Sequence, residues 1–380
     1  MGITALAFAL SAAVSLGASW LLVSRIEHMG DRLGVTDAVL GLLAALAADA
    51  PEITAAVSAL VDHQHEIGAG VVVGSNVFNL AALLGLGAVA AGWVALHRRV
   101  VALTGAVSLW IAAICVCTVL GWLPAVVAFL LVLAALGPYV WLAASRNRSR
   151  LGRWLSVAMT EEELELTPAL EPHSRRWDVP LAVCALLVVV GASIVMEHAA
   201  TTLGVHFSIS GIVVGAVVLA AVTSLPNAVA AVYLARRGRG TAVLSAALNS
   251  NALNIAIGLL LPATVVGLGA TTTPELFVAL WYVGLTAVVL VLAYIDHGLG
   301  RRSGIVILVA YVLFVATLIP VASGGRSLFI LAGPALILVA WSAVVALAPR
   351  RDRGPKDAGP DAATNDERGR GGGRAVDLPH

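Results

Sequence analysis

The hexapeptide GSNVFN at residues 74–79 is repeated 175 positions later as NSNALN at residues 249–254. The octapeptide ALAADAPE at residues 45–52 has its counterpart, at the same offset, in AAVTSLPN at residues 220–227. A third match, at an offset of 170 residues, pairs Glu27-His28 with Glu197-His198. Internal similarity at nearly fixed spacing indicates that the two halves of the chain are copies of one structural unit.

The composition predicts that both copies lie in a membrane. Hydrophobic residues make up 59% of the chain and charged residues only 12%, and the mean hydropathy is +0.95. A transmembrane helix needs about 20 apolar residues. The sequence offers eleven such stretches, at about 3–24, 38–61, 67–96, 100–122, 124–145, 179–197, 207–235, 241–270, 276–295, 303–323 and 327–349. We therefore expect an all-α polytopic membrane protein, with two five-helix halves forming a ten-helix core and one extra C-terminal helix.

The loops between these stretches are asymmetric in charge. Every Arg and Lys except Arg326 falls in the loops of one side or in the tail on that side. By the positive-inside rule this side is cytoplasmic, so we expect the N-terminus outside and the C-terminus inside a plasma (inner) membrane. Because five helices separate equivalent positions, the second copy enters the membrane from the opposite face, which makes the repeat inverted, as in many secondary transporters.

The expected domain organisation follows from this count. Residues 1–145 form the first five-helix repeat and residues 179–323 the second, with a charged cytoplasmic loop at 146–178 between them. Residues 324–349 supply the extra transmembrane helix. The tail at 350–380 is rich in Gly, Asp, Arg and Pro and is expected to be disordered.

Two carboxylates cannot be assigned to helix ends or loops. Asp49 and Glu52 lie inside the second predicted span, where a charged group is costly and is by default a candidate for function. Positions i and i+3 share a helix face, so both acids can face one cavity. A cation there would offset their desolvation and their mutual repulsion.

Repeated prolines add backbone oxygens to the same cavity. Pro51 lies between the two acids and Pro226 occupies the equivalent place in the second copy. Each removes a backbone donor and frees a carbonyl about one turn earlier, near Ala47 and Val222. Carbonyl, carboxylate, amide and hydroxyl oxygens are the ligands that Ca²⁺ and Na⁺ prefer. The repeated motifs supply the remaining candidates: Ser75, Asn79, Thr223, Ser224, Asn227, Ser250 and Asn254.

These paired motifs resemble those of the cation/calcium exchanger superfamily, the sodium/calcium antiporters. Each of its two repeats pairs a Thr-Ser-x-Pro-Glu-like helix with a Gly-Ser-Asn-x-x-Asn-like helix, and the resemblance covers about residues 36–92 and 208–265. It implies alternating access, in which the first and sixth helices slide across a four-helix core. The ligands that it implies are Glu52 and Asn79 in the first repeat, Asn227 and Asn254 in the second, and the hydroxyls of Ser75, Thr223, Ser224 and Ser250.

The chain departs from the superfamily pattern in its charges. The superfamily usually has an acid where this chain has Asn227, and a Thr-Ser pair where it has Ala48-Asp49. With Asp49 in place of the lost acid, the site keeps two formal negative charges, enough for one Ca²⁺ or two Na⁺. We expect no cofactor besides the transported Ca²⁺ and Na⁺ or H⁺.

The leading functional hypothesis is a secondary antiporter exchanging Ca²⁺ for Na⁺, and not an enzyme. The alternatives are a proton-coupled or other-cation antiporter of the same fold, motivated by Asn227, and a degenerate, non-transporting homologue. An intramembrane enzyme using Asp49 and Glu52 as an acid/base pair is a further alternative, but no second nucleophile accompanies the pair. The expected partners are small cations and membrane lipid, whereas the scattered basic residues exclude a nucleic-acid face. The oligomeric state is left open.

Charged residues outside the Asp49–Glu52 region carry weaker signals. Glu27 and Glu197 recur at equivalent places near opposite faces, which suggests gate or entrance groups, but the favoured expectation is a solvated charge at a helix end. Most histidines, His198 among them, lie near the ends of the predicted helices and are expected at the membrane interface.

Overall fold

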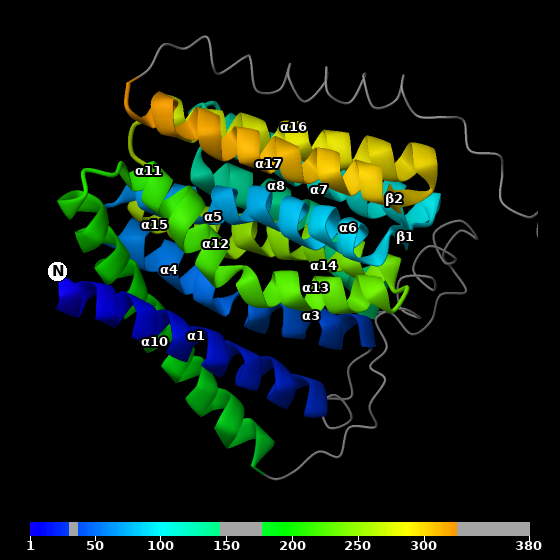
Figure 1. The fold of residues 1–380 in the computed structure, drawn as a ribbon, viewed down its shortest axis with the longest axis horizontal. Coiled ribbons are helices and arrows are strands. Elements are labelled where there is room, and N and C mark those ends of the chain that lie inside the picture. Colours follow the sequence, from blue (N-terminus) through cyan, green and yellow to red (C-terminus); the bar gives the residue numbers. More distant parts are fainter. Residues whose placement is uncertain (30–36, 145–176, 325–380) are drawn as a thin grey trace, which may run out of the picture. The chain divides into compact units, whose positions relative to one another are not determined.

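The structure, a computed structural model, describes residues 1–29, 37–144 and 177–324. The predicted extra helix at 324–349, the predicted tail and nearly all of the predicted loop at 146–178 lie outside the described residues. The first half consists of α1 (Gly2–His28), α3 (Asp37–Ala48), α4 (Ala50–Val61), α5 (His65–Asn79), the π-helical η1 (Leu80–Leu86), α6 (Gly87–Ala91), α7 (Arg98–Val119) and α8 (Ala125–Ala144) (Figure 1). The second half consists of α10 (Asp178–His206), α11 (Gly211–Val213), the π-helical η3 (Val214–Leu219), α12 (Ala220–Thr223), α13 (Leu225–Arg236), α14 (Gly240–Leu253), the π-helical η4 (Asn254–Leu260), α15 (Leu261–Val266), α16 (Thr273–Asp296) and α17 (Arg301–Ala322).

Length and apolarity make most of these helices membrane spans. Among the described residues, seven helices are long and apolar enough to cross a membrane, and nine if each of two bent helix pairs counts as one span. Helix α8 is also apolar, but its segment Ala125–Pro138 is too short to be counted among these spans. The chain is thus a mostly helical, multi-pass membrane protein, and the count of ten core helices stays a prediction.

The two bent pairs are α3 with α4 and α12 with α13. The first pair bends by 55° at Asp49 and the second, which includes α11 and η3, by 49° at Ser224. A proline lies at the start of the helix after each break, where its missing N–H costs nothing because a first-turn N–H has no intrahelical partner. Each break therefore leaves a short stretch of polar backbone and side chains inside the bundle.

Helices α1 and α10 form an antiparallel pair that contacts the rest of the bundle through α3, α4 and η3 (Figure 1). Ser15 and Ser193 share a buried hydrogen bond of 2.7 Å, and Arg25 donates to Asp178 at 3.2 Å. The α1 side of this pair also contacts the first break, because Ser19 donates to the carbonyl of Ala47 at 3.2 Å.

Close packing brings the broken helices together. A Cβ on Gly74 of α5 would lie 2.3 Å from the Cα of Ala216 in η3, so only glycine permits this approach. Small residues at helix contacts serve the same purpose in membrane proteins generally. As a result α5 lies against η3 and α12, while α4 lies against η4.

A small antiparallel ribbon corrects the expectation of an all-α chain. Strand β1 (Trp93–Ala95), after α6, pairs with β2 (Gly298–Gly300), after α16, with Val94 opposite Leu299. Both residues of that pair are buried. Two three-residue connections that meet at one end of the bundle satisfy each other's backbone in this way, which no local periodicity reveals.

Candidate cation-binding site

Glu52 lies in the first turn of α4 and is fully buried, with 0% of its surface exposed. Ser224, at the second break, donates to its Oε1, and Asn254 Nδ2 donates to its Oε2 at 2.6 Å. Both donors belong to the second repeat, although the carboxylate belongs to the first. Charge-assisted bonds of this kind are stronger than neutral ones, so they fix the orientation of the carboxylate.

Asp49 sits at the first helix break and is also 0% exposed. Its Oδ1 accepts hydrogen bonds from Asn227 Nδ2 and from the Ser250 hydroxyl, each at 2.8 Å. Its Oδ2 is buried and has no hydrogen-bond partner among the described residues. One oxygen is therefore held in place while the other is left without a donor.

Four asparagines on α5, α14 and η4 connect the two motif helices. Asn76 Nδ2 donates to the Asn251 carbonyl and Asn251 Nδ2 to the Asn76 carbonyl, each at 3.1 Å. Asn79 Nδ2 donates to Asn251 Oδ1 at 3.1 Å, and Asn254 Nδ2 lies 3.3 Å from Asn76 Oδ1. We call these four residues the amide clasp. Each bond made by a residue of the first repeat is matched by a bond made by its equivalent in the second repeat, 175 residues later, so the clasp is reciprocal.

Within the described ranges, the unpaired carboxylate and amide atoms of the site are acceptors, and the buried hydroxyl of Ser75 is unpaired as well. Besides Asp49 Oδ2, Asn79 Oδ1 and Asn254 Oδ1 are buried without a donor in the described part of the chain. No Arg, Lys or His is among its buried side chains, so no buried basic group balances the two carboxylates. Buried acceptors and buried charge are costly unless they are paired or bind a metal ion. The site is therefore chemically suited to a small cation.

The predicted site residues are largely gathered here. Besides the acids and their donors, Ser75 and Thr223 are fully buried, whereas Asn227 is half-buried. Thr223 donates to the carbonyl of Leu219 in its own helix at 2.9 Å, so its hydroxyl hydrogen does not serve the carboxylates. Pro51 is buried and Pro226 is half-buried, and each is the second residue of the helix after its break.

Sequence reasoning missed several contributors. The carbonyl of Ala47, which was expected to be free, accepts a bond from Ser19 of α1. Asn76 and Asn251 form the centre of the amide clasp, a role that their repeat positions suggested but did not specify. Ser11, Ser15 and Ser19 recur every four residues in α1 and are all buried, a helical spacing that marks this face of α1 and could have pointed to Ser19.

The expectation that Glu197 is a solvated helix-end charge is wrong. Helix α10 continues nine residues beyond it to His206, and Glu197 is 0% exposed. Ser58 of α4 donates to its Oε2 at 3.2 Å and Thr201 to its Oε1 at 2.9 Å. The predicted apolar stretch ended at Glu197, so the acid was expected at a helix end. The helix instead continues past it, and the two hydroxyls allow the acid to be buried.

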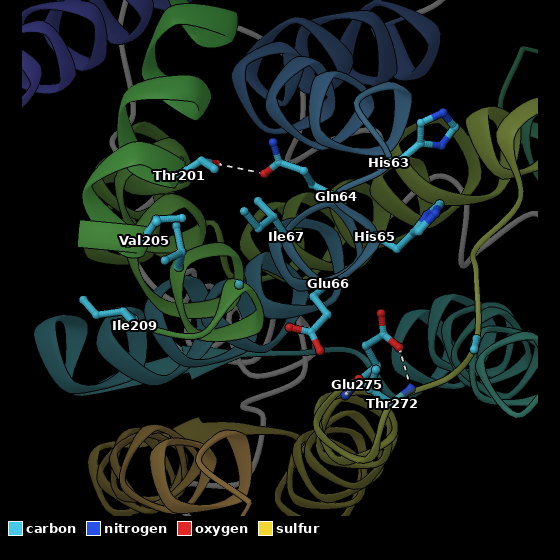
Figure 2. Close-up of a pocket in the computed structure, with 14 residues that line it drawn as sticks. His63, Gln64, His65, Glu66, Ile67, Thr201, Val205, Ile209, Thr272 and Glu275 are labelled. Carbon is cyan, nitrogen blue, oxygen red and sulfur yellow. Dashed lines mark hydrogen bonds between the residues drawn. The ribbon is translucent and has the colours of Figure 1, made fainter. Parts of the chain in front are cut away.

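A cavity of about 530 Å³ opens beside Thr201. Figure 2 shows Gln64, Ile67, Glu66 and His65 on the side of α5 and Thr201 on α10 across from them. The Thr201 hydroxyl lies 3.2 Å from Gln64 Oε1, which joins the two walls. Glu275, paired with Thr272 in a capping box, lines the same cavity.

Helix breaks that bring buried carboxylates, amides and hydroxyls together inside a multi-pass bundle define a membrane transporter of cations. The chain belongs to the sodium/calcium exchanger protein family, which matches residues 3–160 and 179–319. The predicted membership of the cation/calcium exchanger superfamily is therefore confirmed, and the family consists of transporters.

Individual relatives agree with this assignment. The chain is 26% identical to the inner membrane protein YrbG of Escherichia coli (strain K12) over 238 residues, which cover 61% of this chain and 70% of that protein. It superposes on the H⁺/Ca²⁺ exchanger CAX with a TM-score of 0.63 and 14% identity, over 91% of this chain and 92% of CAX. The sodium-calcium exchanger NCX_Mj gives a TM-score of 0.54 and 21% identity, over 84% of this chain and all of NCX_Mj. At these identities the solved structures establish a shared fold.

Proposed function

We propose that this chain is a secondary active antiporter that exchanges Ca²⁺ for Na⁺ at a site formed by Asp49, Glu52 and the amides around them. The observation that carries the proposal is the set of buried acceptor oxygens without donors beside two buried carboxylates. Ca²⁺ takes six to eight oxygen ligands in flexible geometry, and two carboxylates balance its charge. The same oxygens suit two Na⁺ ions, so both cargoes compete for one site.

The proposed architecture is an inverted repeat of two five-helix halves that together form a ten-helix core. It is supported by the common offset of the two motif pairs, by the paired helix breaks and by the reciprocal amide clasp. In this scheme α1 and α10 slide against the four-helix core that carries the site. The proposed orientation, with the N-terminus outside and the C-terminus cytoplasmic, rests on the charge asymmetry of the loops.

The test is Ca²⁺ uptake by the full chain in sealed proteoliposomes. Vesicles loaded with Na⁺ and diluted into Na⁺-free buffer are expected to accumulate ⁴⁵Ca²⁺, and vesicles with equal Na⁺ on both sides are not. Dissipating the Na⁺ gradient with an ionophore should remove the uptake. Ca²⁺ uptake that does not depend on the Na⁺ gradient would contradict the proposed Na⁺ coupling.

Proton coupling is the second candidate function. It is favoured by the uneven placement of charge, since both acids lie in one repeat and Asn227 occupies the position of the second acid. Two neighbouring carboxylates in a low-dielectric site accept a proton or a metal ion as alternative counter-charges. A pH gradient imposed without Na⁺ distinguishes the two candidates, because only proton coupling then drives Ca²⁺ uptake.

A further inference from the structure

Three side chains with metal-ligand chemistry meet where the end of α4 contacts α10. Asp62 caps the C-terminus of α4, and Glu197 and His198 lie on α10. Each offers one ligand atom, and these atoms all lie within 4.8 Å of one another. It is the one group of three or more such residues in the described part of the chain that meets this criterion. Asp62 is ten residues beyond Glu52, or about 15 Å along a helix.

The ring of His198 is oriented so that one nitrogen needs a positive partner. Its Nδ1 lies 2.8 Å from the carbonyl of Ile194, which only accepts hydrogen bonds, so Nδ1 carries a hydrogen. The Nε2 of a neutral ring is then a lone pair, and it faces Asp62 Oδ2 at 3.2 Å. Two acceptors at this distance require a cation or a proton between them. Histidines that bind metals characteristically donate their other ring N–H to such a carbonyl or to a carboxylate.

Glu197 supplies a second, independent indication. Its carboxylate is 0% exposed within a helix that spans the membrane, and the two hydroxyl donors of Ser58 and Thr201 hold its oxygens. Hydroxyls orient a carboxylate but do not neutralise it, and an unneutralised acid inside a membrane helix is expensive. Its Oε2 lies 3.1 Å from His198 Nδ1, the nitrogen that carries the hydrogen shared with the Ile194 carbonyl, and a neutral imidazole brings no charge to the acid. The buried acid therefore has fixed geometry and lacks a fixed positive charge.

We propose that Asp62, Glu197 and His198 form a second cation site that binds a first-row divalent transition metal such as Zn²⁺. Three protein ligands with water in a fourth position are a common arrangement for zinc. An imidazole nitrogen favours such ions over Ca²⁺ and Mg²⁺, which prefer oxygen alone. The half-exposed side chains of His198 (54%) and Asp62 (41%) give an ion access from outside the bundle. A bound ion ties α10 to the end of α4.

The site also borders the cavity of Figure 2. Thr201, which donates to Glu197, lines that cavity and faces Gln64 across it. Gln64 lies two residues after Asp62 in the same connection between α4 and α5. The proposed metal site is therefore adjacent to a cavity through which an ion and its remaining water ligand can enter.

Calorimetric titration of tag-free, purified full chain in detergent with Zn²⁺ tests the proposal. We expect one Zn²⁺ per chain, and His198→Gln and Asp62→Asn should each weaken binding by at least about 10-fold, the smaller effect seen when even a supporting partner of a ligand is lost. His206→Gln removes an exposed histidine from the same helix and should leave the affinity unchanged. The double variant D49N/E52Q should also keep it, because the proposed transport site is separate.

Each other outcome overturns the proposal. If the wild-type chain does not bind Zn²⁺, the positive partner of His198 is a proton. If binding survives both His198→Gln and Asp62→Asn, the ion binds elsewhere, and if it is lost in D49N/E52Q, the ion occupies the transport site. Two ligand variants are used so that the failure of one to fold leaves the other informative. These readouts do not depend on Na⁺ or Ca²⁺ transport, so the proposed function can fail independently.

Discussion

The two helix breaks have the same backbone and opposite chemistry. Asp49 has φ −82° and ψ −6°, and Ser224, 175 residues later, has φ −83° and ψ −2°. The bends are 55° and 49°, and a proline follows each break by two residues. Yet the first break carries two carboxylates, whereas the second carries a threonine, a serine and an asparagine. The backbone of a repeat can therefore persist while its charge moves to one side.

The uneven charge is matched by an uneven supply of donors. All four side chains that donate to Asp49 and Glu52, namely Ser224, Asn227, Ser250 and Asn254, belong to the second repeat. At these two carboxylates, then, the first repeat supplies the acceptors and the second repeat supplies the hydrogens. This complementarity holds the repeats together and leaves the spare carboxylate oxygen for a cation.

Removing the charge of Glu52 should have the largest effect. Glu52→Gln loses a formal charge, and its new NH₂ group faces either the Ser224 hydroxyl or the amide of Asn254, which both donate to the carboxylate. Bonds to charged groups contribute about 1.5–3 kcal/mol each, so Na⁺-driven Ca²⁺ uptake should fall by at least about 100-fold. Initial rates of ⁴⁵Ca²⁺ uptake in proteoliposomes measure it.

The matched control is Asp296→Asn, which neutralises an exposed acid at the end of α16. It should transport at the wild-type rate. Wild-type flux in the Glu52 variant would remove that carboxylate from the site.

An exchange of charge between the repeats sharpens the comparison. Asn227 donates to Asp49 Oδ1 at 2.8 Å, so D49N/N227D reverses the bond without changing the number of atoms or the net charge. The single variant Asp49→Asn should lose about 10-fold or more in uptake. The double variant should recover about 10-fold of that loss, a coupling of about 1.4 kcal/mol, within the range for residues in contact.

The full double-mutant cycle includes Asn227→Asp alone, which places a second carboxylate against Asp49 and should bind Ca²⁺ more tightly than Na⁺ relative to wild type. If the double variant takes up Ca²⁺ no faster than Asp49→Asn, a carboxylate at position 227 cannot replace one at position 49. The two breaks would then be equivalent in backbone but not in function.

The parts of the site that follow a repeat were predictable from sequence, and the contacts between repeats were not. Their position inside an apolar stretch identified Asp49 and Glu52, and the common offset of 175 residues identified the equivalent positions in the second repeat. The bond from Ser19 to Ala47 and the burial of Glu197 depend on how α1 and α10 lie against α4. The ribbon between residues 93–95 and 298–300 depends likewise on a contact between distant connections. The pattern of residues within one segment does not specify which distant segment it contacts.

The amide clasp should respond symmetrically where the charged site does not. Asn76→Ala and Asn251→Ala each remove the donor to the other residue's carbonyl. Each also removes an acceptor, that of Asn254 in the first variant and that of Asn79 in the second. Side-chain hydrogen bonds in membrane bundles average about 0.6 kcal/mol and reach about 1.7. Each variant should therefore lose about 1–2 kcal/mol of stability, and the two losses should agree within about 0.5 kcal/mol. Thermal unfolding in detergent measures both.

Clearly unequal losses would show that the clasp is not a symmetric element. The control is Asn249→Ala, at the position equivalent to Gly74 and on a different face of α14 from Asn251. Its unfolding temperature should be close to that of the wild type.

The smallest effect is expected at Ser19, which has no counterpart in the second repeat. The position 170 residues later is Val189, and it is fully buried. Ser19→Val therefore gives the first repeat the side chain of the second, at the cost of one bond to the Ala47 carbonyl and about 0.6 kcal/mol of stability. Uptake should change by less than about 3-fold, because the carboxylates keep all their donors. A loss as large as that of Glu52→Gln would mean that α1 positions the first break, and the two breaks would then differ in support as well as in charge.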